Sequence, residues 1–288
     1  MKKYFSLVLF AHSIFALPFA MIGFFLGVTT TDNPFNWIKL ALVLLCMVFA
    51  RNAAMAFNRY LDRNIDAKNP RTVMRDIPAG RVSANEALLF VIFNCVLFII
   101  TTAFINSLCF YLSPVALFVV LFYSYTKRFT ALCHLVLGLG LSLAPIGAYI
   151  AVTGVFNLVP VLYSFAVLFW VSGFDIIYAL QDEDFDKAEK LHSIPAALGI
   201  KNALRLSVVL HVLSATCVIL PIFYSHFSWF YYLGVAFFCC MLIYQHLLVK
   251  PNDISKVNRA FATTNGFASV IFAACFLIDA FLRTHFNF

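Results

Sequence analysis

Nine long apolar stretches dominate this 288-residue sequence. A helix needs about 20 mostly apolar residues to cross a bilayer, because each residue adds about 1.5 Å to its length. The stretches that meet this length cover residues 4–28, 36–57, 84–106, 108–126, 131–153, 158–180, 203–223, 228–249 and 257–282. The sequence therefore predicts an all-α, polytopic membrane protein with about nine transmembrane helices.

The composition agrees with this prediction. Hydrophobic residues make up 63% of the chain and charged residues 11%, whereas soluble domains average about 45–50% and about 25%. This balance excludes an ordinary soluble enzyme, a disordered chain, a nucleic-acid-binding module and a disulfide-stapled secreted fold. The first stretch follows Lys2 and Lys3 but is too long for a removable signal peptide and lacks its small-residue exit, so we expect a retained span.

The distribution of lysine and arginine predicts the orientation. With the N-terminus in the cytoplasm, the cytoplasmic segments carry 17 of the 20 basic residues. The opposite side carries two, Lys39 and Arg283, and Arg51 lies inside the second stretch. Cytoplasmic loops of membrane proteins are enriched in basic residues, so we predict a cytoplasmic N-terminus. The formal charge of +7 then reports topology and indicates no nucleic-acid partner.

Two polar groups stand out at the ends of the second and sixth stretches. Each is spaced by four residues: Asn58, Asp62 and Asp66 in the first, and Tyr178, Asp182 and Asp186 in the second. Side chains four apart lie on one face of a helix. Because four stretches separate the two groups, both return to the same face of the membrane.

Stacked carboxylates repel one another unless a cation neutralises them. Mg²⁺ prefers oxygen ligands and is usually held by one or two carboxylates together with substrate phosphates and water. We therefore predict that the two groups face each other and hold Mg²⁺ and a diphosphate, with these metal ligands: Asn58, Asp62, Asp66, Asp182 and Asp186. The alternative is a pair of solvated helix ends.

Basic residues follow both acidic groups and the fourth stretch. We predict that they bind the diphosphate, although the charge bias of cytoplasmic loops explains each of them individually: Arg71, Arg75, Lys127, Arg128, Lys187 and Lys190. Arg51 differs because it lies inside a span, about two turns before Asn58. A charge at that depth indicates function, and its expected partner is an acid of the cavity or the acceptor substrate.

These residues resemble the UbiA family of intramembrane aromatic prenyltransferases. The resemblance covers essentially the whole chain and rests on four segments: Asn58-x3-Asp62-x3-Asp66, the loop 69–81, Tyr-Thr-Lys-Arg-Phe-Thr at 125–130, and Tyr178-x3-Asp182-x3-Asp186. It implies one domain over residues 1–288, with the helices bundled around a central cavity that opens at the cytoplasmic face. It also implies Mg²⁺ bridging a prenyl diphosphate to both acidic motifs, and a location in the bacterial inner membrane.

Within the family, residues 50–72 look most like the 4-hydroxybenzoate polyprenyltransferase branch. The expected reaction is transfer of a polyprenyl group from its diphosphate to an aromatic hydroxy-carboxylate in respiratory quinone biosynthesis. Residues 10–20 resemble members from bacteria that make menaquinone, and the basic residue that ubiquinone enzymes carry early in the first span is absent. The alternative acceptor is therefore a naphthoate precursor of menaquinone.

The reaction assigns roles to four further residues. Tyr178 is a candidate for stabilising the allylic cation through its ring face, and Asp175 for taking the proton that the acceptor ring loses, or for an outer metal ligand. Arg51 and His12 are candidates for contacting the acceptor, with a packing role as the alternative for His12. The polyprenyl tail partitions into membrane lipid, so a lateral opening to the bilayer is expected.

Two other classes use intramembrane acids. A CDP-alcohol phosphotransferase carries one contiguous aspartate motif beginning with Asp-Gly, which neither group here shows. An ion-coupled transporter places acids near the bilayer midplane on broken helices, whereas these acids lie at one face of the membrane. Both classes are therefore weaker interpretations than a prenyltransferase.

Overall fold

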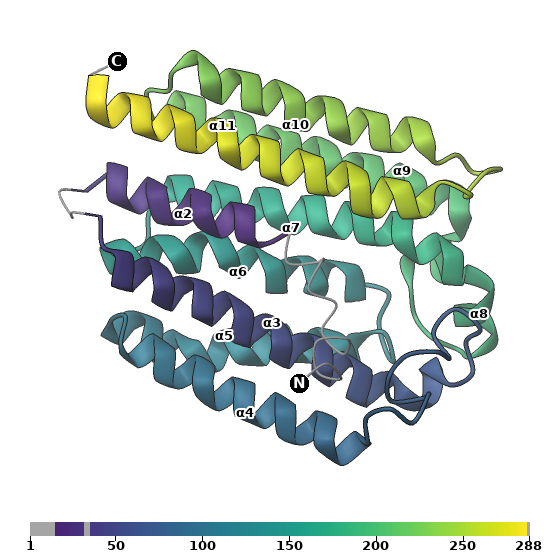
Figure 1. The fold of residues 1–288 in the computed structure, drawn as a ribbon. Helices are drawn as coiled ribbons and strands as arrows, with labels where there is room; N and C mark the ends of the chain where they lie inside the picture. The colour runs from purple at the N-terminus through teal and green to yellow at the C-terminus, as the bar shows by residue number, and fades with distance from the viewer. Residues whose placement is uncertain (1–14, 32–34, 287–288) are drawn as a thin grey trace.

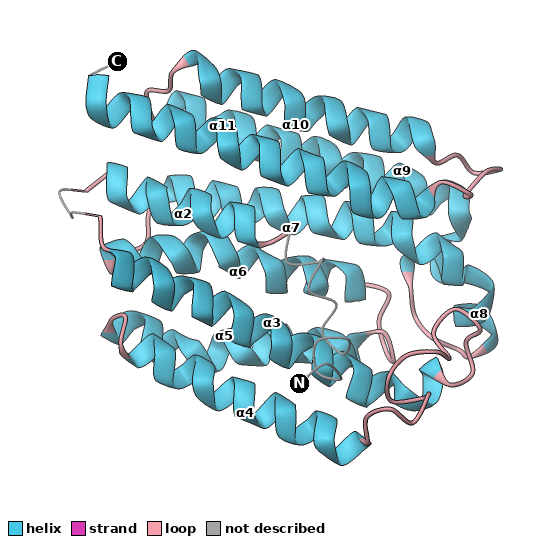
Figure 2. Cartoon of the chain, viewed as in Figure 1, coloured by secondary structure: helices cyan, strands magenta, loops and turns pink. Residues whose placement is uncertain are grey.

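The computed structural model describes residues 15–31 and 35–286. The described chain is a bundle of long helices that run side by side (Figure 1), joined by short loops and without strands (Figure 2). The helices are α2 (Leu17–Thr29), α3 (Trp37–Asp66), α4 (Ala84–Ala103), α5 (Ser107–Thr126), α6 (Cys133–Thr153), α7 (Leu158–Ala179), α8 (Glu183–Ala188), α9 (Ile194–Ile219), α10 (Trp229–Leu248) and α11 (Asn265–Phe286).

Eight helical segments of the described chain are long and apolar enough to cross a membrane. The shorter apolar helix α2 covers the second half of the first predicted stretch; the beginning of that stretch lies outside the described residues. The predicted all-helical membrane fold is confirmed. The agreement of the bounds varies: the fourth stretch, predicted at 108–126, is helical from Ser107 to Thr126, whereas the helix of the seventh, predicted at 203–223, is Ile194–Ile219.

Polar caps start several of these helices. The side chains of Asn36, Ser83, Asn106 and Ser193 each accept a hydrogen bond from a backbone N–H in the first turn of the helix that follows. Such caps satisfy N–H groups that have no partner within the helix. Polar residues between the apolar runs therefore determine where these four helices begin.

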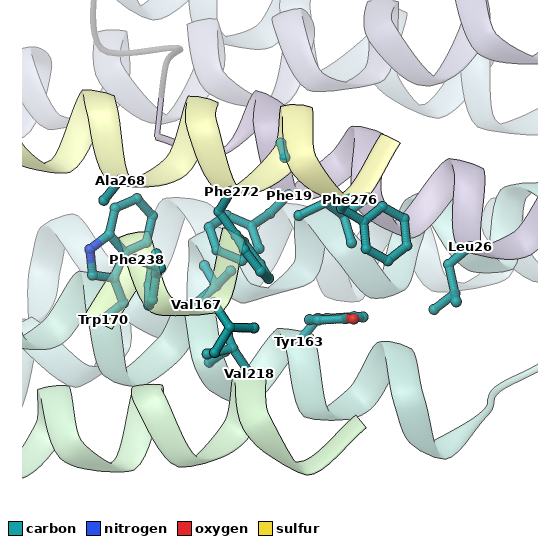
Figure 3. Close-up of a cluster of buried hydrophobic side chains, with 14 of the residues drawn as sticks. Phe19, Leu26, Tyr163, Val167, Trp170, Val218, Phe238, Ala268, Phe272 and Phe276 are labelled. Carbon is teal, nitrogen blue, oxygen red and sulfur yellow. The ribbon is translucent and has the colours of Figure 1, made fainter. Parts of the chain in front are cut away.

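A tightly packed aromatic core joins α2, α7, α10 and α11 (Figure 3). The ring of Trp170 on α7 lies 5.4 Å from that of Phe19 and 5.8 Å from that of Phe238, measured between ring centres. Phe272 on α11 packs on the same side chains, 5.9 Å from Phe19 and 5.5 Å from Phe238. Aromatic and aliphatic side chains therefore fill the space between these four helices.

Small residues allow α6 to approach its neighbours closely. A Cβ atom at Gly23 of α2 would lie 2.0 Å from the carbonyl oxygen of Pro145, and one at Gly138 of α6 would lie 2.4 Å from that of Leu168. Membrane helices commonly use small residues in this way. The contacts hold α2, α6 and α7 in a defined register, and α6 and α7 carry part of the site described below.

The polar segments gather at one end of the bundle. There α3 ends, the loop 67–83 folds back, and α8 follows α7 (Figure 1). The first acidic group lies on one continuous helix, as predicted, but the second does not. After Ala179 the chain forms a single 3₁₀ turn, Leu180–Asp182, before α8. The break places three acids in the first turn of α8, where the helix dipole favours negative charge.

Candidate active site

A cavity of about 780 Å³ lies between α3, α5, α6 and α7, and the loop 67–83 forms part of its polar end. Eleven of the predicted site residues line it: Arg51, Asn58, Asp62, Asp66, Arg71, Arg75, Lys127, Asp175, Tyr178, Asp182 and Asp186. The two acidic groups therefore meet at one cavity, although 107 to 113 residues separate the partners in the contacts between the loop and the second group described below. Arg128, Lys187 and Lys190 are not among the lining residues, and His12 lies outside the described residues.

Asp62 is the most enclosed acid of the first group, with 2% of its surface exposed. Asn58, one helical turn earlier, donates a hydrogen bond from Nδ2 to its Oδ2 over 3.0 Å. Arg128 donates to its Oδ1 over 3.0 Å, and Lys127 Nζ lies 3.5 Å from Oδ2. A buried carboxylate is stable only when it is paired in this way, so the end of α5 and α3 are joined through Asp62.

Asp66 ends α3 and is paired within the following loop. The Nη1 atom of Arg75 lies 2.8 Å and 2.9 Å from its two carboxylate oxygens. The hydroxyl of Thr72 donates to the Asp66 carbonyl over 3.1 Å. These bonds fold the loop back over the helix end and bring its arginines to the cavity.

Arg71 connects the loop to the second acidic group. Its guanidinium bonds to both oxygens of Asp182, with Nε 3.0 Å from Oδ1, and Nη1 donates to the hydroxyl of Tyr178 over 2.7 Å. Asn69 donates to Asp182 over 3.1 Å. Burial lowers the pKa of Arg71, but the hydrogen bonds and charge of Asp182 outweigh it and raise that pKa above its usual value. The guanidinium is therefore charged throughout the physiological range.

Asp62, Asp66 and Asp182 each pair with a basic side chain. These pairings affect which ligands the site offers to Mg²⁺. No group of three or more His, Cys, Asp or Glu side chains in the described chain lies close enough to bind an ion alone. Mg²⁺ bound together with a diphosphate needs only one or two carboxylates from the protein. The carboxylates of Asp62, Asp66, Asp182 and Asp186 and the Asn58 amide all line the cavity, so the donor set fits an ion that is held partly by substrate.

Asp175 lies one turn before Tyr178 on α7, and its partner is His134 on α6. The His134 Nδ1 atom is 2.7 Å from Asp175 Oδ2, and both residues line the cavity. His134 was not among the predicted site residues, because no motif spacing joins it to an acid 41 residues away. Only the packing of α6 on α7 brings them together.

Two arginines of α3 lie on the same cavity. Arg51 lines it as predicted, with Nη2 3.1 Å from the sulfur of Met55. Arg59, which the sequence analysis also missed, lines it with 8% of its surface exposed, and its Nη1 has no hydrogen-bond partner among the described residues. It follows Asn58 directly in the sequence and is not part of the four-residue spacing that defines the motif.

Two predicted diphosphate-binding lysines lie away from the cavity lining. Lys187 pairs with Glu183, one turn earlier on α8, over 2.6 Å. Lys190 follows α8 in a left-handed backbone conformation. Neither lysine is among the lining residues, although Asp186, which precedes Lys187 directly on α8, is one of them. Adjacent side chains of a helix point in different directions.

The rest of the cavity is apolar. Its walls include Phe98 from α4, Leu112 and Val115 from α5, and Leu141 from α6. Near the polar end, the ring of Tyr178 lies 4.2 Å from that of Phe261. The cavity therefore combines a charged end with a hydrophobic body and an aromatic wall between them.

A membrane bundle that gathers two acidic motifs and an arginine-bearing loop at one end of an apolar cavity has the architecture of an intramembrane prenyltransferase. Residues 16–275 match the UbiA prenyltransferase family, and the chain belongs to this family. The protein is therefore an enzyme that transfers prenyl groups, as predicted from the motifs.

The relatives support the same assignment. The chain is 30% identical over 240 residues to the 4-hydroxybenzoate octaprenyltransferase of Tolumonas auensis, covering 83% of this chain and 84% of the relative. It is 28% identical over 236 residues to the enzyme of the same name from Francisella tularensis subsp. novicida, covering 81% and 82%.

Two solved structures share the fold. The apo UbiA homolog from Aeropyrum pernix K1 has a TM-score of 0.84 and 32% identity, over 93% of this chain and 98% of the other. A UbiA homolog from Archaeoglobus fulgidus bound to DMAPP and Mg²⁺ has a TM-score of 0.73 and 21% identity, over 97% and 99%. At that identity the second comparison shows the fold alone.

Proposed function

We propose that the enzyme transfers a polyprenyl group from its diphosphate to an aromatic hydroxy-carboxylate of the 4-hydroxybenzoate type, in respiratory quinone biosynthesis. The observation that carries this proposal is the convergence of both acidic motifs and the loop 67–83 on one apolar cavity. The names of the similar curated enzymes support the choice of acceptor. The missing basic residue in the first span keeps a naphthoate acceptor as the second candidate.

The diphosphate is proposed to bind at the charged end. When bound, Mg²⁺ would neutralise the departing diphosphate, held by the carboxylates and amide of Asn58, Asp62, Asp66, Asp182 and Asp186. Arg71, Arg75 and Lys127 line the same end and would contact phosphate oxygens, while Arg128 holds Asp62. Arginine forks match phosphate geometry well, and these cations already face the carboxylates that would take the metal.

The aromatic side chains of Tyr178 and Phe261, near the charged end of the cavity, are proposed to take part in the reaction. The bond between the allylic carbon and the diphosphate oxygen breaks, and its electron pair leaves with the diphosphate. The ring of Tyr178, beside Phe261, would stabilise the cation that remains, at about 0.5–2 kcal/mol for each such contact. A ring carbon of the acceptor then bonds to the cation, and Asp175 takes the ring proton.

Arg51 is proposed to hold the acceptor carboxylate. It lies seven residues before Asn58 on the same helix, which corresponds to about 10 Å along the axis. The acceptor would thus lie deeper than the diphosphate, beyond the reacting carbon. His12, the other predicted acceptor contact, remains a proposal for a residue outside the described part of the chain.

The apolar body of the cavity is proposed to hold the prenyl chain and to open toward lipid. Val48, Val115 and Phe156 line the cavity, and each has more than a third of its surface exposed. A chain of many CH₂ groups, each worth about 0.8 kcal/mol when buried, favours such a route. We further propose that the charged end faces the cytoplasm of the bacterial inner membrane, because the basic segments gather there.

The proposal is tested with purified protein in liposomes. The protein is incubated with Mg²⁺, a polyprenyl diphosphate and either 4-hydroxybenzoate or a hydroxynaphthoate, and the products are identified by mass. Prenylated 4-hydroxybenzoate is expected. If only the hydroxynaphthoate is prenylated, the acceptor is a naphthoate and not 4-hydroxybenzoate. If neither compound is prenylated, the result contradicts the proposed function.

A further inference from the structure

His134 is a buried histidine at the beginning of α6 that joins three elements. Its side chain is 5% exposed. Nδ1 lies 2.7 Å from Oδ2 of Asp175 on α7, and the backbone N–H of Ile194, the first residue of α9, donates to Nε2 over 3.3 Å. Both nitrogens of the ring are therefore engaged, on opposite sides.

These two contacts determine the tautomer. A backbone N–H can only donate, so Nε2 must be the accepting, unprotonated nitrogen of a neutral imidazole. The proton of the ring is then on Nδ1 and is donated to Asp175. Asp175 accepts this bond through Oδ2, and its side chain, which is 22% exposed, is among the residues that line the cavity.

The backbone around the pair is held tightly. The Ser172 hydroxyl on α7 has two carbonyl acceptors within reach of its single proton, that of His134 at 3.1 Å and that of Leu168 at 2.7 Å. The absence of a side chain at Gly138 allows α6 to lie directly on Leu168. The imidazole is thus supported by the helix contact itself, and not by a flexible loop.

We infer that His134 is a positioning residue that orients the Asp175 carboxylate toward the acceptor ring, so that its outer oxygen takes the ring proton after the new carbon–carbon bond forms. The inference rests on the proposed function. Hydrogen bonding to Oδ2 fixes the rotation of the Asp175 carboxylate, which leaves the other oxygen to take the proton. The proton moves from the ring carbon to Asp175, the ring regains its aromaticity, and His134 keeps its own proton throughout.

The test measures kcat and both KM values for His134→Leu, His134→Gln, Asp175→Asn and the double variant His134→Leu/Asp175→Asn. Glutamine can donate to Asp175 and accept from Ile194, whereas leucine can do neither. A misplaced catalytic group typically costs up to about a hundredfold in rate. We expect His134→Leu to lower kcat by about tenfold to a hundredfold, with the KM for prenyl diphosphate nearly unchanged, and His134→Gln to recover most of the loss.

Two further readouts separate positioning from simple destabilisation. If His134 acts through Asp175, His134→Leu should have little additional effect in the Asp175→Asn background. With an acceptor deuterated at the attacked ring position, His134→Leu should raise the kinetic isotope effect, because proton loss becomes slower. His246→Leu is the matched control, since it breaks another buried histidine contact, with His211 over 2.8 Å, outside the cavity lining; it should leave the isotope effect unchanged.

Equal losses of kcat from His134→Leu in both backgrounds, or no recovery by glutamine, would overturn the inference. If the leucine variant does not fold, His134→Ala is assayed with added imidazole, where recovery of rate supports the inference and its absence overturns it. A wild-type protein that makes no prenylated product would instead overturn the proposed function, and the inference with it.

Discussion

Replacing Arg71 by glutamine should lower kcat/KM for the prenyl diphosphate and leave the KM for the acceptor nearly unchanged. Arg71 contacts Asp182 and Tyr178 with three nitrogens, and its side chain is 31% exposed. In the substrate complex we expect this fork to contact the diphosphate. Loss of one charge-assisted hydrogen bond costs about 1.5–3 kcal/mol, and the partial exposure favours the lower end of that range.

The expected loss in kcat/KM for the prenyl diphosphate is therefore about ten- to fiftyfold. Arg71→Lys should lose less, because it keeps the charge but cannot contact Asp182 and Tyr178 together. Lys68→Gln is the control. It removes an ion pair in the same loop, with Glu189 over 2.6 Å, but Lys68 does not line the cavity. Steady-state kinetics that show equal loss for Arg71→Gln and Lys68→Gln, or a loss confined to the acceptor KM, would refute this reasoning.

Three other predictions concern the acceptor, the topology and the packing. Arg51→Ala should raise the acceptor KM about tenfold to a hundredfold and leave the prenyl diphosphate KM nearly unchanged; the reverse pattern in steady-state kinetics would remove Arg51 from the acceptor site. Reporters fused after Arg81 or Leu198 should be cytoplasmic and one at the C-terminus external, whereas a cytoplasmic C-terminus would mean an even number of spans. Gly23→Val should lower stability by about 1–3 kcal/mol, because its side chain would meet Pro145. Thermal unfolding compared with Gly140→Ala, whose Cβ would make only ordinary contacts, tests this.

The sequence was sufficient to predict the helices and the first acidic motif. Apolar stretches of fixed length and polar caps are local signals, and the spacing from Asn58 to Asp66 lies within one uninterrupted helix. The local structure of the second motif was harder to predict. Its spacing is the same, but three successive acids follow Leu180–Gln181, and the chain forms a 3₁₀ turn before α8. Lys187 and Lys190 follow the second motif closely in sequence, but they are not among the lining residues.

Contacts between helices could not be read from spacing. The pairing of Asp175 with His134 depends on the register between α6 and α7, which small residues such as Gly138 set. The bond between Arg71 and Asp182 depends on how the loop 67–83 folds, and Asp66, Thr72 and Arg75 determine that. The sequence contains these residues, but their contacts depend on how the helices and the loop pack in three dimensions.

Binding of a polyprenyl diphosphate analogue, with its bridging oxygen replaced by sulfur, tests most directly whether the two acidic motifs form one metal–diphosphate site. The measurement is titration calorimetry on the wild-type protein, Asp62→Asn and Asp182→Asn, each with Mg²⁺ and with a chelator. We predict that wild-type binding requires Mg²⁺ and that either substitution weakens it by at least about tenfold, since each removes a charged contact worth roughly 1.5–3 kcal/mol. Binding that is independent of Mg²⁺, or that is unchanged by both substitutions, would contradict a shared site.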